Sequence, residues 1–118
     1  MVFDKYVELE IKGKKHRMCY PNKYVWEMER QLSNGNIQLT VMNAGRGTPP
    51  TLYDTFTIIK YAFLGGNPKL TEDEAEELYM EAVAEHPLLD VFTCAMEALT
   101  KSGILGQVKK APAAPKKA

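Results

Sequence analysis

Apolar and polar residues alternate near the beginning of the chain, in the stretch KYVELEIKGKKHRMCY. Val7, Leu9 and Ile11 are separated by single polar residues, which is the two-residue period of a strand with one buried face. The pair Gly13-Lys14 has the composition of a type II′ turn, which connects two antiparallel strands. The pattern therefore predicts an N-terminal β-hairpin.

The turn also predicts which residues face each other across the hairpin. Ile11 would lie opposite His16 on the apolar face, and Glu10 would lie opposite Arg17 on the polar face as an attractive pair. The same register places Leu9 opposite Met18 and Val7 opposite Tyr20. His16 would then lie at the turn end of the apolar face. A structural histidine is expected there, because no second metal ligand or catalytic partner lies near it in the sequence.

Beyond the hairpin, apolar residues recur every three or four positions in four stretches, which is the period of an α-helix. These stretches cover residues 23–32, 51–64, 72–85 and 88–102. The side chains predicted to face inward are Tyr24, Val25, Met28 and Leu32; Leu52, Phe56, Ile58, Ile59, Ala62 and Phe63; Ala75, Leu78, Tyr79, Ala82 and Val83; and Leu88, Val91, Phe92, Ala95, Met96 and Leu99. The predicted fold is α+β, an N-terminal β-hairpin followed by a mainly helical domain of about four helices.

Residues typical of helix ends flank these stretches. Thr71 and Glu74 form the [ST]xxE pattern of a capping box, in which each side chain binds a backbone amide of the other residue. Gly65-Gly66 and Gly103 follow the second and the fourth stretch, at positions where glycine commonly ends a helix. These signals predict that the second helix stops before Gly65.

Residues 36–48 show neither the two-residue period of a strand nor the three-to-four-residue period of a helix clearly. The segment from Ile37 to Met42 favours a strand, and a glycine and proline-rich loop that can be mobile follows it. Arg46 lies in the sequence AGRG, which lacks the spacing of a phosphate-binding loop. Arg46 is therefore interpreted as a loop cation that a protein partner can engage.

Trp26 does not belong to the inward stripe of the first predicted helix. At about 100° per residue, it points well away from Val25, Met28 and Leu32. Two interpretations are open, a contact with a second internal neighbour or exposure to solvent, and the internal contact is favoured.

The composition indicates one domain that needs neither disulfides nor metal. The chain has 118 residues, of which 45% are hydrophobic, and residues 1–106 are predicted to form a single globular domain. Residues 107–118, QVKKAPAAPKKA, offer nothing to bury and are predicted to be a disordered tail. Cys19 and Cys94 lie in unrelated segments without a zinc-binding pattern, so no metal or other cofactor is expected. No apolar run has the length of a signal sequence or a membrane span, which predicts a cytoplasmic protein.

The formal net charge of zero conceals a strong segregation of charge. Residues 70–100 contain nine acidic residues and no lysine or arginine, so all fifteen basic residues and the other six acids lie elsewhere. The basic residues are scattered over a hairpin, two loops and a tail, whereas a DNA-binding protein typically presents one continuous basic face. Nucleic-acid binding is therefore disfavoured.

Three glutamates in the acidic segment have the spacing of a functional site. Glu77, Glu81 and Glu85 recur every four residues and would lie along one side of a helix, as in a carboxylate-bridged metal centre. That side is predicted to face water, roughly opposite the apolar residues, and no glutamate here has a histidine three positions later. A solvated face cannot supply the desolvation that a catalytic carboxylate needs. The remaining interpretations are a solubilising surface and an electrostatic docking face for a basic partner.

The order of elements resembles a known family of viral proteins. A hairpin ending in Tyr20-Pro21, a helix with Glu27 and Glu29 before Gly35, a glycine and proline loop, the LTEDE opening at Leu70 and a lysine, alanine and proline tail are similar to the tail assembly chaperones of long-tailed bacteriophages and prophages. The related small tail proteins of gene transfer agents share this order. The resemblance covers residues 6–106 and is architectural, without a diagnostic motif.

The resemblance implies a protein that is not an enzyme and that acts in the host cytoplasm. Such a chaperone engages the tape-measure protein and helps tail-tube subunits to polymerise around it. Candidate partner-binding residues are Glu77, Glu81, Glu85, Trp26 and Arg46, and self-association into a homo-oligomer is also possible. The alternative functions are a structural tail or head-tail subunit of the virion and, less favoured, a nucleic-acid-binding regulator.

Overall fold

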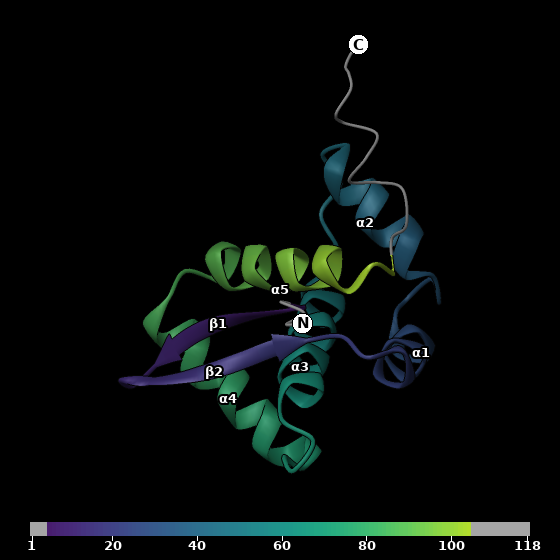
Figure 1. Cartoon of the computed structure of the whole chain (residues 1–118). Helices are drawn as coiled ribbons and strands as arrows, with labels where there is room; N and C mark the ends of the chain where they lie inside the picture. Colours follow the sequence, from purple (N-terminus) through teal and green to yellow (C-terminus); the bar gives the residue numbers. More distant parts are fainter. Residues whose placement is uncertain (1–4, 105–118) are drawn as a thin grey trace.

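The computed structural model of the chain describes residues 5–104. These residues form a two-stranded antiparallel sheet followed by five helices, which confirms the predicted α+β fold with one helix more than expected (Figure 1). The elements are β1 (Tyr6–Ile11), β2 (Lys14–Cys19), α1 (Asn22–Gln31), α2 (Ile37–Gly45), α3 (Leu52–Gly66), α4 (Glu72–Glu85) and α5 (Leu88–Ser102). The predicted tail at 107–118 lies outside the described residues.

The predicted hairpin is present. Its turn lies one residue earlier than predicted, and the pairing of its strands differs from the predicted register by two residues. Lys12 and Gly13 form the turn with φ of 55° and 78°, so both turn residues adopt the left-handed conformation that a type I′ turn requires. Ile11 therefore pairs with Lys14, and Leu9 pairs with His16. A shift of two residues keeps every side chain on its predicted face, because side chains alternate with a period of two. Leu9, Ile11, Met18 and Tyr20 are accordingly buried as expected.

The segment predicted as a strand and loop is the helix α2. The side chain of Asn36 accepts a hydrogen bond from the amide of Leu39 at 2.9 Å, and the Glu29 carboxylate accepts one from the amide of Ile37 at 3.0 Å. These two acceptors satisfy amides of the first helical turn, which the helix itself leaves unpaired. The β-branched residues that favoured a strand have no third strand to join among the described residues. Local capping therefore outweighs the intrinsic preference for a strand.

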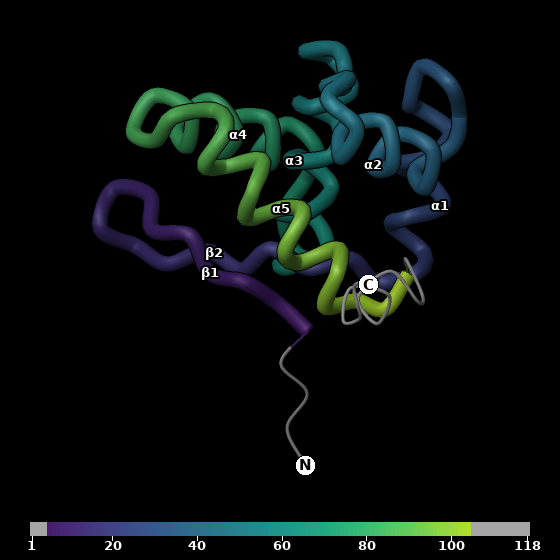
Figure 2. Tube along the Cα trace, turned by 90° about the horizontal axis from the view of Figure 1, so that it is seen from above, coloured from purple at the N-terminus to yellow at the C-terminus, as the bar shows by residue number. Residues whose placement is uncertain are grey.

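Helix α3 is the central element of the domain and is buried on nearly all sides. It packs against β2, α1, α4 and α5, and its buried residues include Ile58, Ile59 and Phe63. Figure 2 shows the helices grouped on one side of the hairpin, with α5 crossing it near β1. The predicted single inward stripe was therefore too narrow. Leu52, which was predicted to face inward, is 74% exposed at the beginning of α3.

Gly65 and Gly66 do not end α3 as predicted but belong to its last turn. A Cβ atom on Gly65 would overlap the carbonyl oxygen of Cys19, and one on Gly66 would overlap the carbonyl oxygen of Arg17. The two glycines are needed because the end of α3 lies directly against the backbone of β2. The two glycines allow α3 to pack closely on β2. The prediction that they end the helix was therefore wrong.

The predictions for α4 and α5 are confirmed. Thr71 accepts a hydrogen bond from the amide of Glu74, and Glu74 accepts one from the amide of Thr71, which completes the capping box. Gly103 ends α5 in the left-handed conformation with φ of 82°. Ala75, Leu78 and Ala82 of α4 and Val91, Ala95 and Leu99 of α5 are buried in the core.

Candidate protein-binding surface

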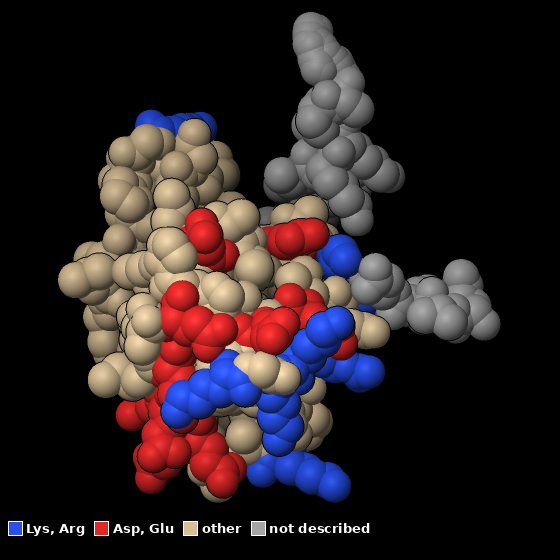
Figure 3. Space-filling model, turned by 90° about the vertical axis from the view of Figure 1, so that its left-hand side faces the viewer, with Lys and Arg blue, Asp and Glu red and all other residues tan. Residues whose placement is uncertain are grey.

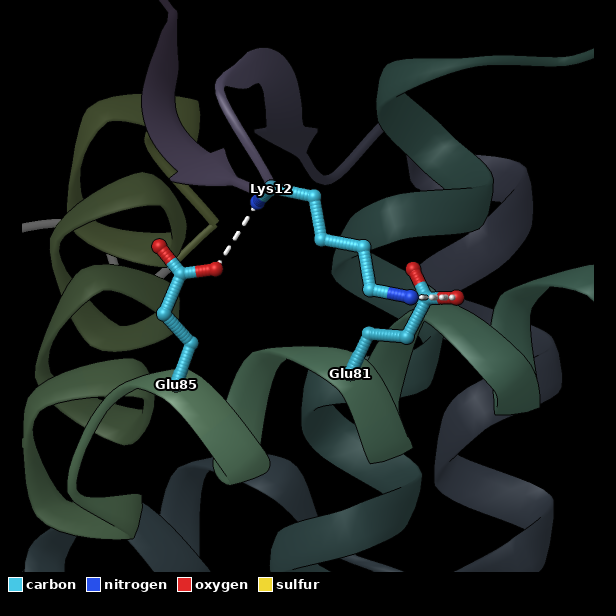
Figure 4. A network of polar contacts seen from close by, with 3 residues as sticks. All are labelled: Lys12, Glu81 and Glu85. Carbon is cyan, nitrogen blue, oxygen red and sulfur yellow. Dashed lines mark hydrogen bonds and ion pairs between the residues drawn. The ribbon is translucent and has the colours of Figure 1, made fainter.

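Two of the three carboxylates predicted to form a docking ladder, Glu81 and Glu85, hold the hairpin turn to α4 (Figure 4). The backbone amide of Lys12 donates a hydrogen bond to Glu85 Oε1 at 2.8 Å, and Lys12 Nζ lies 3.3 Å from Glu81 Oε2. The side chains of Glu81 and Glu85 are 39% and 40% exposed. The ladder was predicted to face water, and Glu77 and Glu85 are exposed, whereas Glu81 is half-buried. Glu81 and Glu85 also bind the hairpin turn, which the sequence did not predict.

A histidine extends this contact between the hairpin and α4. His86 Nε2 lies 2.7 Å from the carbonyl oxygen of Glu10, to which the ring N–H donates a hydrogen bond, and 3.6 Å from Glu85 Oε2. The groups Lys12, Glu81, Glu85, Glu10 and His86 together form what we call the hairpin clasp. Figure 3 shows basic side chains directly beside acidic ones on one face of the molecule. The clasp gives Glu81 and Glu85 an intramolecular role, and their binding to a partner stays a prediction.

The other two predicted partner-binding residues lie elsewhere. Trp26 in α1 is 65% exposed, so the favoured internal contact is wrong, and the inward side of α1 is occupied by Val25 and Met28. Arg46 is exposed at the C-terminal end of α2. Because α1, α2 and α4 lie in separate parts of the molecule, the structure does not bring these residues and Glu77 into one site (Figure 1).

A groove that the sequence did not reveal lies between the connection from α2 to α3 and the beginning of α5. Its volume is about 530 Å³. The residues that line it are Ala44, Gly47, Pro49, Pro50, Leu52, Thr55, Leu88, Leu89 and Phe92, none of which carries a charge. We call it the apolar groove.

Two leucines at this groove are the most exposed large apolar side chains among the described residues. Leu52 is 74% exposed and Leu89 is 71% exposed. Tyr53, the neighbour of Leu52 on α3, is 55% exposed. Contiguous exposed apolar surface is typical of sites that bind another protein or a ligand.

The backbone that carries Leu52 is firmly anchored. Thr51 accepts a hydrogen bond from the amide of Asp54 at 3.0 Å, which caps α3. The buried carboxylate of Asp54 in turn accepts bonds from the amide and the hydroxyl of Ser33, both at 3.0 Å. Leu52 is thus presented from a capped helix end that is tied to Ser33, two residues after the end of α1.

Two signals in the sequence could have located this surface. Between Gln31 and Tyr53 the sole charged residue is Arg46, although much of this stretch is exposed. The consecutive pair Leu88-Leu89 at the beginning of α5 is a second signal, because only Leu88 can share the inward stripe with Val91 and Phe92. A long uncharged stretch that is not buried indicates an interaction surface.

The titratable side chains do not add a reactive group to the groove. Burial raises the pKa of the Cys94 thiol, and the nearby carboxylates of Glu97 and Asp90 raise it further. Burial likewise raises the pKa of Cys19. Within residues 5–104, no three histidine, cysteine or acidic side chains converge as a metal site would require. In the same range, no helix has the length and apolar character needed to span a membrane.

Comparison of the chain with protein-family models, curated proteins and solved structures gave no match. The apolar groove and the exposed leucines beside it are the features of the described residues that bear on function. That surface, apolar, concave and uncharged, is suited to hold an apolar segment of another polypeptide.

Proposed function

We propose that the chain is a non-enzymatic tail assembly chaperone of a long-tailed bacteriophage or prophage and that it binds the tape-measure protein in the apolar groove. The observation that supports this proposal best is the exposure of Leu52 and Leu89, at 74% and 71%, on either side of the groove. Covering a leucine that is otherwise exposed contributes about 1.5–3 kcal/mol, so these two side chains favour a bound state.

The occupant that we propose for the groove is the apolar face of a helix. Grooves formed by helices commonly bind the apolar face of an amphipathic helix through residues spaced three and four apart. The family that the chain resembles engages the tape-measure protein and helps tail-tube subunits to polymerise around it. We propose that an apolar face of the tape-measure protein needs cover until the tube surrounds it. In this proposal the groove supplies that cover in the host cytoplasm.

The hairpin clasp changes the part assigned to the acidic ladder. Glu81 and Glu85 hold the hairpin, so of the three carboxylates the exposed Glu77 is the best placed to steer a basic partner. Electrostatic steering affects the rate of association and its salt dependence more than the affinity. The groove is therefore the primary contact and the acidic face of α4 a secondary one.

A pull-down with the co-expressed tape-measure protein tests the proposal. Leu52→Gln and Leu89→Gln are expected to reduce the captured tape-measure protein at least about tenfold when combined, because together they remove apolar contacts worth more than about 1.4 kcal/mol. The matched control is Met80→Gln, since Met80 is 64% exposed on α4 and does not line the groove. Undiminished capture by a folded double variant would contradict the proposal.

A second measurement separates the chaperone from the alternative of a structural subunit. A chaperone acts before the tail is complete, so mass spectrometry of purified virions is expected to find the chain absent or far below the copy number of the tube protein. Recovery in a fixed ratio to the tube protein would favour the structural alternative.

A further inference from the structure

A small polar pocket adjoins the apolar groove, since Pro49 and Pro50 line both. Its volume is about 150 Å³. The other residues that line it all carry side-chain oxygen atoms: Asn34, Thr40, Asn43, Thr48, Thr51 and Asp54. The pocket therefore offers several hydrogen-bond acceptors, of which a single one is a carboxylate.

The carboxylate of Asp54 is buried without a basic partner. Asp54 is 4% exposed, and no basic side chain of residues 5–104 forms an ion pair with it. Both bonds from Ser33 reach Oδ1, whereas Oδ2 accepts none within the same range. The first turn of α3 and the Ser33 donors offset part of the cost of this buried charge. Because buried charges are ordinarily paired, the remaining oxygen favours a cationic ligand in the pocket.

Neutral oxygen atoms accompany this carboxylate. Among the described residues, the side chains of Asn43 and Thr48 form no hydrogen bond, so both are available to a ligand. Thr40 donates its hydroxyl proton to the carbonyl oxygen of Asn36 at 2.9 Å, which leaves the lone pairs of the hydroxyl for a further donor. Arg46 does not line the pocket, although it lies between Asn43 and Thr48 in the chain. The pocket thus combines one negative charge with several neutral acceptors.

We propose that this pocket binds the guanidinium group of an arginine side chain from a protein partner. A guanidinium carries one positive charge, which matches the single carboxylate, and its N–H donors form a planar fork that serves several acceptors at once. Asp54 Oδ2, the amide oxygen of Asn43 and the hydroxyl of Thr48 are acceptors of this kind. A calcium ion takes about six to eight oxygen ligands, commonly with several carboxylates, and the pocket holds one carboxylate.

The position of the pocket gives the bound arginine a place in a longer partner. Because Pro49 and Pro50 line both the pocket and the groove, one polypeptide segment can place its apolar face in the groove and an arginine in the pocket. This extension rests on the proposed function, whereas the arginine site itself does not.

A titration with a blocked amino acid tests the site. N-acetyl-arginine methylamide is added to the full ¹⁵N-labelled chain at constant ionic strength, and N-acetyl-citrulline methylamide, which has nearly the same shape and no charge, is the control ligand. Arginine is expected to shift the amide signals of Ser33 and Asp54 and to saturate in the millimolar range, as is usual for a single side chain. Equal shifts with citrulline, or arginine shifts centred on α4, would overturn the proposal. So would a saturable response to calcium chloride at Asp54 with none to arginine.

Matched variants locate the binding. Asp54→Asn keeps an acceptor for Ser33 but removes the charge, and it is expected to raise the dissociation constant at least about tenfold. Asp73→Asn makes the same change in the first turn of α4, at an exposed residue, and should leave the constant as it is. Circular dichroism checks folding. Asn43→Ala keeps the charge of Asp54 and removes one neutral acceptor, so it should weaken binding about fivefold even if Asp54→Asn does not fold. Unchanged binding by the folded variants of the pocket would refute the site.

The titration contains no tape-measure protein, so its outcome is independent of the proposed function. A negative titration would leave groove binding unaffected, and a negative pull-down with the Leu52 and Leu89 variants would leave the arginine site unaffected.

Discussion

The backbone amide of Lys12 and the carboxylate of Glu85, which are 73 residues apart in the chain, are joined by a hydrogen bond of 2.8 Å. The bond ties the hairpin turn to the last turn of α4. It also explains how the turn accommodates Lys12 at a φ of 55°, since tertiary contacts commonly hold residues in conformations that they rarely adopt alone.

Removal of this bond is expected to lower the stability of the domain. Glu85→Ala should reduce the free energy of unfolding by about 1 kcal/mol, because it removes a charge-assisted hydrogen bond at a partly exposed site. Glu77→Ala, on the same side of α4, should change it by less than about 0.5 kcal/mol. Urea unfolding of both variants measures the difference. Equal effects would mean that the bond to Lys12 does not contribute.

Alanine at Gly65 or Gly66 is expected to destabilise strongly. The added methyl group would overlap a carbonyl oxygen of β2 at Cys19 or Arg17, and rigid backbone cannot move aside as a flexible side chain can. We expect a cost of about 3 kcal/mol or more for each change. Gly45→Ala in α2 is the control, since nothing lies within 4 Å of the added atom and alanine favours a helix. It should be neutral or stabilise by up to about 1 kcal/mol. Similar melting temperatures for all three variants would refute the close packing of α3 on β2.

Core phenylalanines are expected to differ in importance according to their burial. Phe63 is 1% exposed and contacts the His16 ring edge-on, so Phe63→Ala should cost about 3–5 kcal/mol. Phe56 is half-buried and packs against the ring of Tyr79 with centroids 4.9 Å apart, so Phe56→Ala should cost less, about 2 kcal/mol. Chemical unfolding of the two variants gives the order, and a larger loss at Phe56 would show that the position of α3 in the core is misjudged.

Stability is expected to fall at alkaline pH, in part because of Tyr20. Burial raises the pKa of Tyr20 well above its ordinary value, and the neighbouring Cys19 raises it further. The unfolded chain ionises tyrosine near pH 10 whereas the folded chain keeps the proton, so this contribution is complete below about pH 10 and is lost as the pH rises above it.

Tyr20→Phe tests this contribution. The Tyr20 hydroxyl donates a hydrogen bond of 2.6 Å to the buried carbonyl oxygen of Ile58, so the variant should lose about 1 kcal/mol at neutral pH. It should also lose less stability than the wild type between neutral pH and about pH 11. Tyr53→Phe, at an exposed tyrosine, serves as the control. Identical alkaline profiles for all three proteins would argue against the role of Tyr20.

The sequence predicted the elements with clear local signals and missed those set by distant neighbours. The capping box at Thr71 and the stop at Gly103 depend on residues within one helical turn, and both were predicted correctly. The helix α2 was missed because one of its two amide acceptors, Glu29, lies eight residues before Ile37 and in another helix. The role of Gly65 and Gly66 depends on β2, which is more than 45 residues away and leaves no mark on the local pattern.

The candidate site was less predictable than the fold. Glu77, Glu81 and Glu85 were singled out by their spacing, but spacing cannot show that Lys12 lies within reach of two of them. Leu52 and Leu89 were hidden in apolar stretches, because an exposed leucine and a buried leucine look the same in a hydropathy pattern. The stretch from Gln31 to Tyr53, whose sole charged residue is Arg46, was one of the two available signals, and it became meaningful once its exposure was known.

The packing of α5 on β1 also constrains the order of events during synthesis. The first strand lies against the last helix, and Lys101 Nζ donates a hydrogen bond to the carbonyl oxygen of Tyr6 at 3.4 Å. Because synthesis runs from the N-terminus to the C-terminus, the hairpin emerges from the ribosome long before α5, the helix that covers it. Non-local contacts of this kind are formed late, since the intervening chain must first be ordered. The domain can complete its core only after α5 has been translated, and until then the apolar face of the hairpin is open to other proteins in the cell.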